Sequence, residues 1–165
     1  MSQVMTQTDA LVELRLLTPK VTLDDRDDFF VTLINSDLPM EIVTRLTALW
    51  DVTREVGGEI VYVGKLIVYE IMEFIAKFPH LTIGLAIGAV LHTLLAAVPI
   101  IGPILTPIAA AVSASIGFRL DSGKPLSGSL EGTLINTFAD IVAMAKSFLQ
   151  WFLNVLKLAF ADATN

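Results

Sequence analysis

Residues 78–118 read FPHLTIGLAIGAVLHTLLAAVPIIGPILTPIAAAVSASIGF and contain no Asp, Glu, Lys or Arg. A run of about 18 or more apolar residues is typical of a helix that spans a membrane. Pro99, Gly102 and Pro103 interrupt the run near its middle, where they disfavour a continuous helix. The stretch therefore predicts a hydrophobic helical hairpin over residues 80–118, with these three residues at its tip.

Each arm of the predicted hairpin reaches most of the way across a bilayer. At about 1.5 Å per residue, helices over residues 81–98 and 104–118 would be about 27 Å and about 22 Å long. The hydrocarbon core of a bilayer is about 30 Å thick. We therefore expect the lipid bilayer to be a partner of the chain, with the short second arm also compatible with a monotopic hairpin.

Amphipathic helices are expected on both sides of the hairpin. Pro39 suits the first turn of a helix, and apolar residues at helical spacing predict about five turns from there to a break or kink at residues 57–58. Helical spacing resumes over residues 59–78, which carry one charged stripe. Residues 133–161 form a C-terminal amphipathic helix with their polar positions on one face.

Composition supports a membrane protein. Apolar residues make up 54% of the chain and charged residues 17%, with a mean hydropathy of +0.70, whereas soluble domains have about 25% charged residues. The fold expected is an all-α membrane protein with a central hydrophobic hairpin flanked by amphipathic helices. Residues 38–165 form the helical membrane domain, and residues 1–37 an acidic, weakly ordered N-terminal arm with one short helix at either end.

The alternative is a soluble helical domain with the hairpin as its buried centre. Pore-forming colicins have that pattern, and the hairpin over residues 78–118 resembles theirs in outline. A chain of this length has few amphipathic helices with which to hide two apolar arms. The sequence therefore favours residence in the membrane.

The charges beside the hairpin predict its orientation. Lys77 precedes the first arm, Arg119 and Lys124 follow the second, and the tip is uncharged. Because positive charges favour the cytoplasmic side, we expect the inner or plasma membrane as the location, with both termini in the cytoplasm. Residues 1–38 lack the basic start and apolar core of a secretory signal.

Small residues recur at four-residue spacing on both arms of the hairpin. Gly84 and Gly88 share a face of the first arm, and Ala109, Ser113 and Gly117 share a face of the second. Such faces let transmembrane helices approach closely. The two interpretations are an interface between protomers and packing between the arms of one hairpin, and the second is favoured because any tight hairpin requires it.

Charged residues preceding the hairpin are candidates for lining a pore. Lys65, Glu70, Glu73 and Lys77 form a stripe that could line an aqueous path if several copies assembled. The simpler interpretation, which the pattern favours, is a solvated helix face.

His92 continues the Gly84 and Gly88 face of the first arm by one turn. An ionisable residue deep in an apolar segment is a candidate pore-lining or proton-sensing group. The simpler interpretation is a neutral imidazole bonded to a hydroxyl such as that of Thr93, Thr106 or Ser113.

Composition also excludes several classes of function. The net charge is −6 with a pI near 4.7, which argues against nucleic acid as a partner because phosphate backbones require clustered Lys and Arg. The chain has no Cys, its two His are not at ligand spacing, and no phosphate loop, dinucleotide fingerprint or nucleophile elbow occurs. We therefore expect no catalysis, no metal and no cofactor.

Two functions of different classes remain. The first is a homo-oligomeric protein that forms pores or permeabilises membranes, and so transports ions, because one hairpin alone cannot enclose water. The second is a structural or accessory membrane subunit that anchors a protein partner through its acidic N-terminal arm. Apolar spans with striped flanks are compatible with both.

Overall fold

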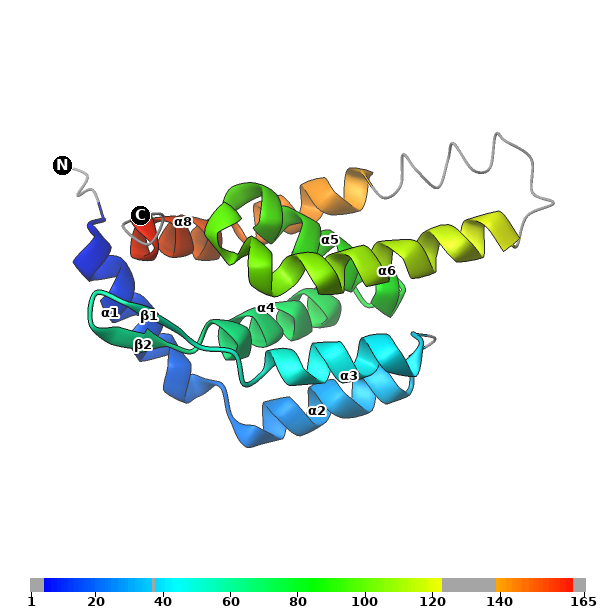
Figure 1. Cartoon of the computed structure of the whole chain (residues 1–165), viewed down its shortest axis with the longest axis horizontal. Helices are drawn as coiled ribbons and strands as arrows, with labels where there is room; N and C mark the ends of the chain where they lie inside the picture. The colour runs from blue at the N-terminus through cyan, green and yellow to red at the C-terminus, as the bar shows by residue number, and fades with distance from the viewer. Residues whose placement is uncertain (1–4, 37, 123–138, 162–165) are drawn as a thin grey trace.

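The computed structural model describes residues 5–36, 38–122 and 139–161, without the side chains of residue 113 and of residues 115–122. The described chain is mostly helical. In chain order its elements are α1 (Gln7–Leu17), η1 (Thr18–Lys20), α2 (Leu23–Ile34), α3 (Met40–Leu49), β1 (Arg54–Val56), β2 (Glu59–Val61), α4 (Val63–Lys77), α5 (Ile83–Ala97), η2 (Pro99–Ile101), α6 (Gly102–Ser122), the helix Ala139–Phe148 and α8 (Gln150–Ala159). Figure 1 shows them in tiers, with α2 and α3 below, α4 in the middle, and α5, α6 and the C-terminal helices above.

The central helix of the fold is α4, which packs against α2, α3 and α5. Its inward face is fully buried at Val63, Leu66, Ile67, Ile71 and Phe74. Burying an aliphatic or aromatic side chain of this size contributes about 1.5–3 kcal/mol. The predicted charged stripe of this segment accordingly lies on the remaining face, and the helix begins at Val63 rather than at Glu59.

The N-terminal arm contains a short helix towards either end, as expected for residues 1–37. Both α1 and α2 begin with a capping box, in which Thr6 pairs with Asp9 and Thr22 pairs with Asp25. In such a box the Thr hydroxyl accepts from a free backbone N–H at the helix start while the acid accepts from the N–H of the cap residue. Asp9 and Asp25 of this acidic arm therefore help to start its two helices.

The cap of α2 gives a first testable prediction. Replacing Thr22 by Ala removes the acceptor for the backbone N–H of Asp25, at 3.3 Å, and should lower the free energy of unfolding by about 1 kcal/mol. Urea unfolding measures it. Thr44→Ala is the matched control, because the Thr44 hydroxyl only donates to the Met40 carbonyl inside α3. Equal stability of the two variants would contradict the cap.

The expectation of an all-α chain is wrong between α3 and α4. The helix expected to reach residue 56 ends at Leu49, and β1 and β2 form a two-stranded antiparallel hairpin in which Val56 pairs with Glu59. Gly57 and Gly58 form its turn with φ of +59° and +81°. Two successive residues with positive φ are the requirement of the tight turn that matches the twist of a β-hairpin.

The predicted hydrophobic hairpin is present as α5, η2 and α6. Thr82 caps α5 by accepting from the backbone N–H of Leu85 at 3.3 Å. The chain direction then changes by 119° between Ile83–Ala97 and Pro99–Val112, and α5 packs along α6. The second arm differs from the expectation because the helix begins at Gly102, inside the predicted tip, and continues to Ser122.

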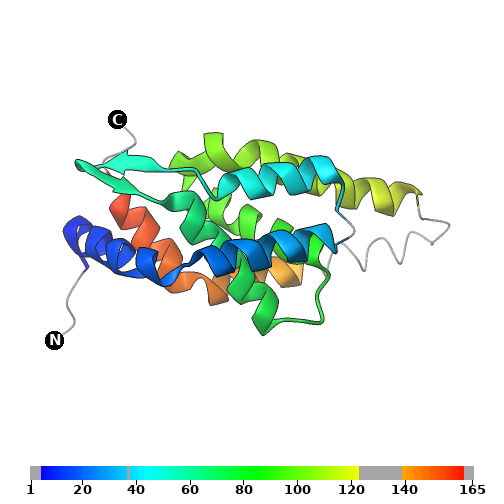
Figure 2. The same ribbon diagram turned by 90° about the horizontal axis from the view of Figure 1, so that it is seen from below.

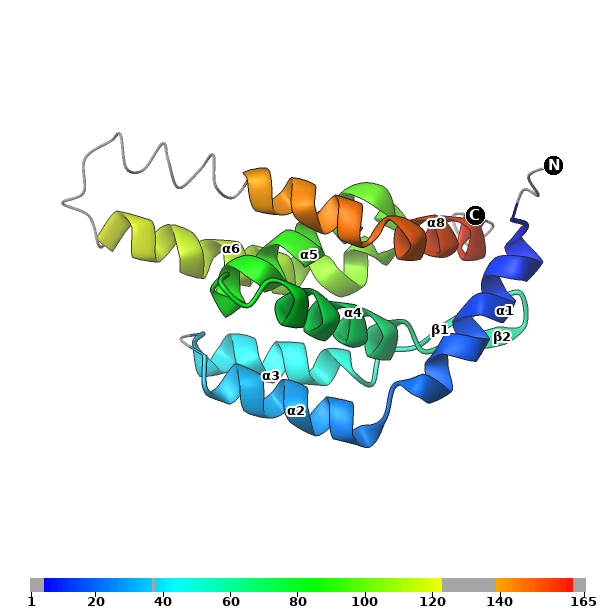
Figure 3. The same cartoon turned by 180° about the vertical axis from the view of Figure 1, so that it is seen from behind.

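The C-terminal segment is bent, where a single helix over residues 133–161 was expected. Residues 133–138 lie outside the described residues, and the helices Ala139–Phe148 and α8 meet at 69°. The bend keeps Ile141 and Ala145 on one side of it, and Phe152 on the other, all buried in the core. Figures 2 and 3 show α8 beside α1, against which it packs, so the first and last described helices lie side by side.

No single helix within the described ranges is both long and apolar enough to cross a membrane. Two bent pairs meet the requirements of length and composition when their helices are taken together. They are Ile83–Ala97 with Pro99–Val112, and Ala139–Phe148 with Gln150–Ala159.

Candidate functional site

The first arm of the hairpin, α5, is the most enclosed uncharged element. Its central residues Ile87, Val90, Leu91 and Leu94 have 0% exposure, and α4, α6 and α8 all pack against it. The buried hydroxyl of Thr93 donates to the Ala89 carbonyl at 2.7 Å, so its proton is satisfied within the helix. The arm is thus held in an apolar environment supplied by the second arm, α6, and by the amphipathic helices α4 and α8.

The structure describes the surroundings of some of the residues on the two predicted small-residue faces. Gly84 is half-buried, and a Cβ added there would lie 3.5 Å from the Leu38 side chain, on the segment that leads into α3. Gly88 is buried within α5, and Ala109 of α6 is half-buried against the core. Ser113 and Gly117 lie within α6, but the structure describes only the backbone there. The interface between protomers stays a prediction.

The tip residues occupy a short helical turn. Pro99 opens η2, and Gly102 and Pro103 begin α6. Pro99 and Pro103 are exposed, whereas Ile101 between them is completely buried. The tip is therefore held to the core by the buried Ile101, with the partly buried Ile100 and Ile104 packed against the same core.

Lys65, the first residue of the predicted pore-lining stripe, lies over aromatic rings. Its ammonium group is 5.6 Å from the ring centroid of Trp50 and 5.9 Å from that of Tyr62. A cation over the face of an aromatic ring is attracted by about 0.5–1 kcal/mol at exposed sites. Lys65 therefore has a packing role at the junction of α3, β2 and α4.

The next residues of the stripe form an acidic group on α4. Burial, followed by the charge of Glu73, raises the pKa of Glu70 from 4.5 to about 7. Burial also raises the pKa of Tyr69, followed by the charge of Glu73 and a hydrogen bond with it, and by the charges of Glu70 and of Asp25 from α2. Glu73 and Lys77 are exposed. The stripe thus runs from solvent into a partly buried carboxyl group that titrates near neutral pH.

His92 is exposed at the edge of a cleft of about 340 Å³. Its lining comes from α5, the helix Ala139–Phe148 and α8, and consists of His92, Thr93, Ala96, Ala97, Val142, Lys146, Gln150, Leu153, Asn154 and Lys157. Lys146 and Lys157 were not recognised as site residues in the sequence. The sequence shows that the two lysines are eleven residues apart, but only the fold brings them to His92, which precedes both by more than fifty residues.

A second cleft of about 640 Å³ lies where α1 faces β2. An ion pair between Arg15 and Glu59 connects its two walls, and Lys65 and Tyr62 also line it. Both side chains of the pair are substantially exposed, and exposed pairs contribute little to stability. Among its described lining residues this cleft has two positive side chains, Arg15 and Lys65, and one negative side chain, Glu59, which pairs with Arg15.

Among the residues that the structure describes, no three His, Cys, Asp or Glu side chains are grouped to hold a metal ion. No protein-family model, curated protein or solved structure matches the chain. The function is therefore inferred from the chain's own residues and geometry.

Proposed function

We propose that this chain is a non-enzymatic protein that inserts its α5–α6 hairpin into a bilayer and permeabilises it as a homo-oligomer. The observation that carries the proposal is the charge-free stretch of residues 78–118, whose first arm is buried between the second arm and the amphipathic helices α4 and α8. Exposing that arm to water is unfavourable, whereas lipid accepts it without such a cost. Because all backbone groups inside a helix are paired, the arms also meet the backbone requirement of a bilayer.

The flanking helices provide the polar surface that a pore requires. A hairpin alone cannot enclose water, so several copies must assemble. The striped face of α4 with Glu70, Glu73 and Lys77, and the exposed His92 of α5, are the candidates to face a shared lumen. The proposed location is the inner or plasma membrane, with both termini on the cytoplasmic side.

A charge placed on an exposed position of the hairpin tests the proposal. Ala110 is exposed on α6, so Ala110→Glu leaves the packing of the folded chain intact. In a membrane-inserted arm the same carboxylate costs about 2.5–3.5 kcal/mol, which reduces insertion by roughly a hundredfold. We expect the wild type to release a trapped dye from lipid vesicles and Ala110→Glu to release almost none.

The matched control is Ala76→Glu. Ala76 is also an exposed helical alanine, but it lies on α4 outside the hairpin. We expect this variant to release dye as the wild type does, with the same thermal unfolding as Ala110→Glu. No release by the wild type, or equal release by all three proteins, would contradict the proposed function.

The second candidate, an accessory membrane subunit, is favoured by the exposed face of the N-terminal arm. Large apolar side chains there are 42–69% exposed, and they are Leu16, Leu23, Phe30, Val31 and Ile34. Exposed apolar patches of this kind are typical of surfaces that bind other proteins. A membrane-bound wild type that releases no dye, in vesicles where the hairpin is inserted, would favour this candidate.

A further inference from the structure

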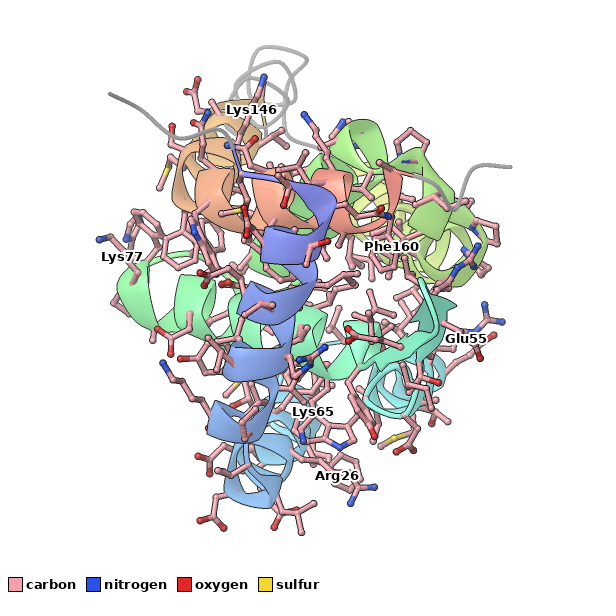
Figure 4. All side chains as sticks on the ribbon, turned by 90° about the vertical axis from the view of Figure 1, so that its left-hand side faces the viewer. Arg26, Glu55, Lys65, Lys77, Lys146 and Phe160 are labelled. Atoms are coloured by element: carbon pink, nitrogen blue, oxygen red, sulfur yellow. The ribbon has the colours of Figure 1, made fainter. Side chains whose placement is uncertain are left out.

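The cleft beside His92 is distinguished by its charge. The chain has a net charge of −6, yet among the residues that the structure describes the lining of this cleft includes Lys146, Lys157 and His92 and no Asp or Glu. Lys146 lies on the helix Ala139–Phe148, at the top in Figure 4, and Lys157 lies on α8. Two lysines gathered without a carboxylate, on an acidic protein, form a local site for an anion.

The polar groups of the cleft suit a phosphate ester. Gln150 and Asn154 are exposed on α8 between the two lysines in sequence, and their amide groups add hydrogen-bond donors to the ammonium groups. Phosphate oxygens accept from ammonium and amide groups, and hydrogen bonds between charged partners are roughly twice as strong as neutral ones.

The apolar groups and the size of the cleft limit the kind of molecule to which a bound phosphate can belong. Thr93 and Leu153 are buried and Ala97 and Val142 half-buried along the lining, which provides a floor for carbon atoms. A volume of about 340 Å³ is at the lower end of the range for small-molecule sites, about 300–1,000 Å³. It admits a headgroup with its glycerol, while acyl chains must remain outside.

We propose that this cleft binds the phosphate ester headgroup of an anionic lipid. The inference rests on the proposed function for the presence of a membrane. The cleft lies between α5, the helix Ala139–Phe148 and α8, and α8 packs against α5. A headgroup bound there contacts the hairpin arm and two of the helices that enclose it.

Vesicle binding measures the site separately from permeabilisation. At low ionic strength the wild type should cosediment with vesicles containing phosphatidylglycerol and much less with vesicles of phosphatidylcholine alone. The net charge of the protein by itself predicts repulsion from the anionic vesicles. Each lysine near an anionic membrane surface favours binding by about fivefold, so the double variant Lys146→Gln/Lys157→Gln should bind roughly thirtyfold more weakly.

The double variant Lys20→Gln/Arg26→Gln is the matched control. It also removes two positive charges, but from exposed positions on η1 and α2. Figure 4 shows Arg26 and Lys146 at opposite ends of the view. It should bind anionic vesicles within about twofold of the wild type. Equal losses in the two double variants, or no preference of the wild type for anionic vesicles, would overturn the proposal.

Two further measurements are needed. One distinguishes a lipid headgroup from a soluble phosphate ester, and the other distinguishes the headgroup site from the proposed function. Glycerol 1-phosphate in solution should compete only weakly with vesicles, and binding of this soluble ester without binding of vesicles would overturn the assignment to a lipid. Ala110→Glu should retain the preference for anionic vesicles while losing dye release. Retained binding without dye release in the wild type would overturn the proposed function and support the headgroup site.

Discussion

Gly64→Ala is expected to lower the free energy of unfolding by about 3 kcal/mol or more, although alanine favours helices over glycine by about 1 kcal/mol. Gly64 lies in the first turn of α4, where the end of α3 crosses it. A Cβ at this position would overlap the Leu49 carbonyl oxygen, and would lie 2.9 Å from the Leu49 carbonyl carbon and 3.1 Å from Val52 Cβ. Backbone atoms cannot move aside as a side chain does.

A second helical glycine provides the control for this prediction. In α5, a Cβ at Gly84 meets only a Leu38 methyl group at 3.5 Å, an ordinary contact distance. Gly84→Ala should therefore leave the stability unchanged or raise it by about 0.5 kcal/mol. Chemical denaturation of both variants measures the difference. Similar stabilities would mean that α3 and α4 do not approach as closely as described.

Glu70→Gln is expected to remove a pH dependence of stability of about 3 kcal/mol. The pKa of Glu70 is about 7 in the folded chain, whereas the ordinary value for a glutamate, which applies to the unfolded chain, is 4.5. Below about pH 4.5 the Glu70 carboxyl is protonated in both the folded and the unfolded chain, and its contribution to the free energy of unfolding is fully present. Between about pH 4.5 and 7 only the folded state holds it, so the free energy of unfolding falls as pH rises and is then constant.

Unfolding free energies from about pH 4 to about pH 8 test this expectation. The difference between Glu70→Gln and the wild type should grow with pH until about pH 7, in favour of the variant. Glu55→Gln is the control, because Glu55 is exposed on β1, where Figure 4 shows it at the outer surface. A difference that is flat with pH for Glu70→Gln would show that this carboxyl group is not held in a desolvated position.

The hairpin could be predicted from sequence because its signals are local. The absence of charge over residues 78–118 and the residues Pro99, Gly102 and Pro103 act without reference to the remainder of the fold. The exact start of α6 could not be predicted, because prolines at the beginning of a helix and prolines in a loop use the same dihedral angles.

Two local patterns in the sequence indicated a structure other than the one that forms. Thr22 and Asp25 have the spacing of a capping box, but the acidic residues around them indicated a weakly ordered arm. Gly57 and Gly58 are flanked by Val56 and Ile60, which favour strands. Apolar residues at helical spacing on both sides indicated a helix break instead, because the short strands are too brief to show their own alternation.

The cleft beside His92 could not be predicted because it is created by tertiary packing. His92 belongs to one arm of the hairpin, while Lys146 and Lys157 belong to two helices separated by a bend at Leu149. No Gly or Pro marks that bend in the sequence. In an uninterrupted helix Lys146 and Lys157, eleven residues apart, would share one face, but nothing in the sequence indicates that this face meets His92 of α5.

The pairing of α1 with α8 has a consequence for the biosynthesis of the chain. The Gln7 side chain donates to the Ala159 carbonyl at 3.1 Å, a contact between residues separated by 152 positions. A ribosome therefore releases α1 long before its partner helix exists, and it releases the apolar hairpin before the C-terminal helices that pack on it. Domains fold as units during synthesis, so until residues 150–159 emerge the nascent chain presents an α5–α6 hairpin that lacks the part of its cover supplied by α8.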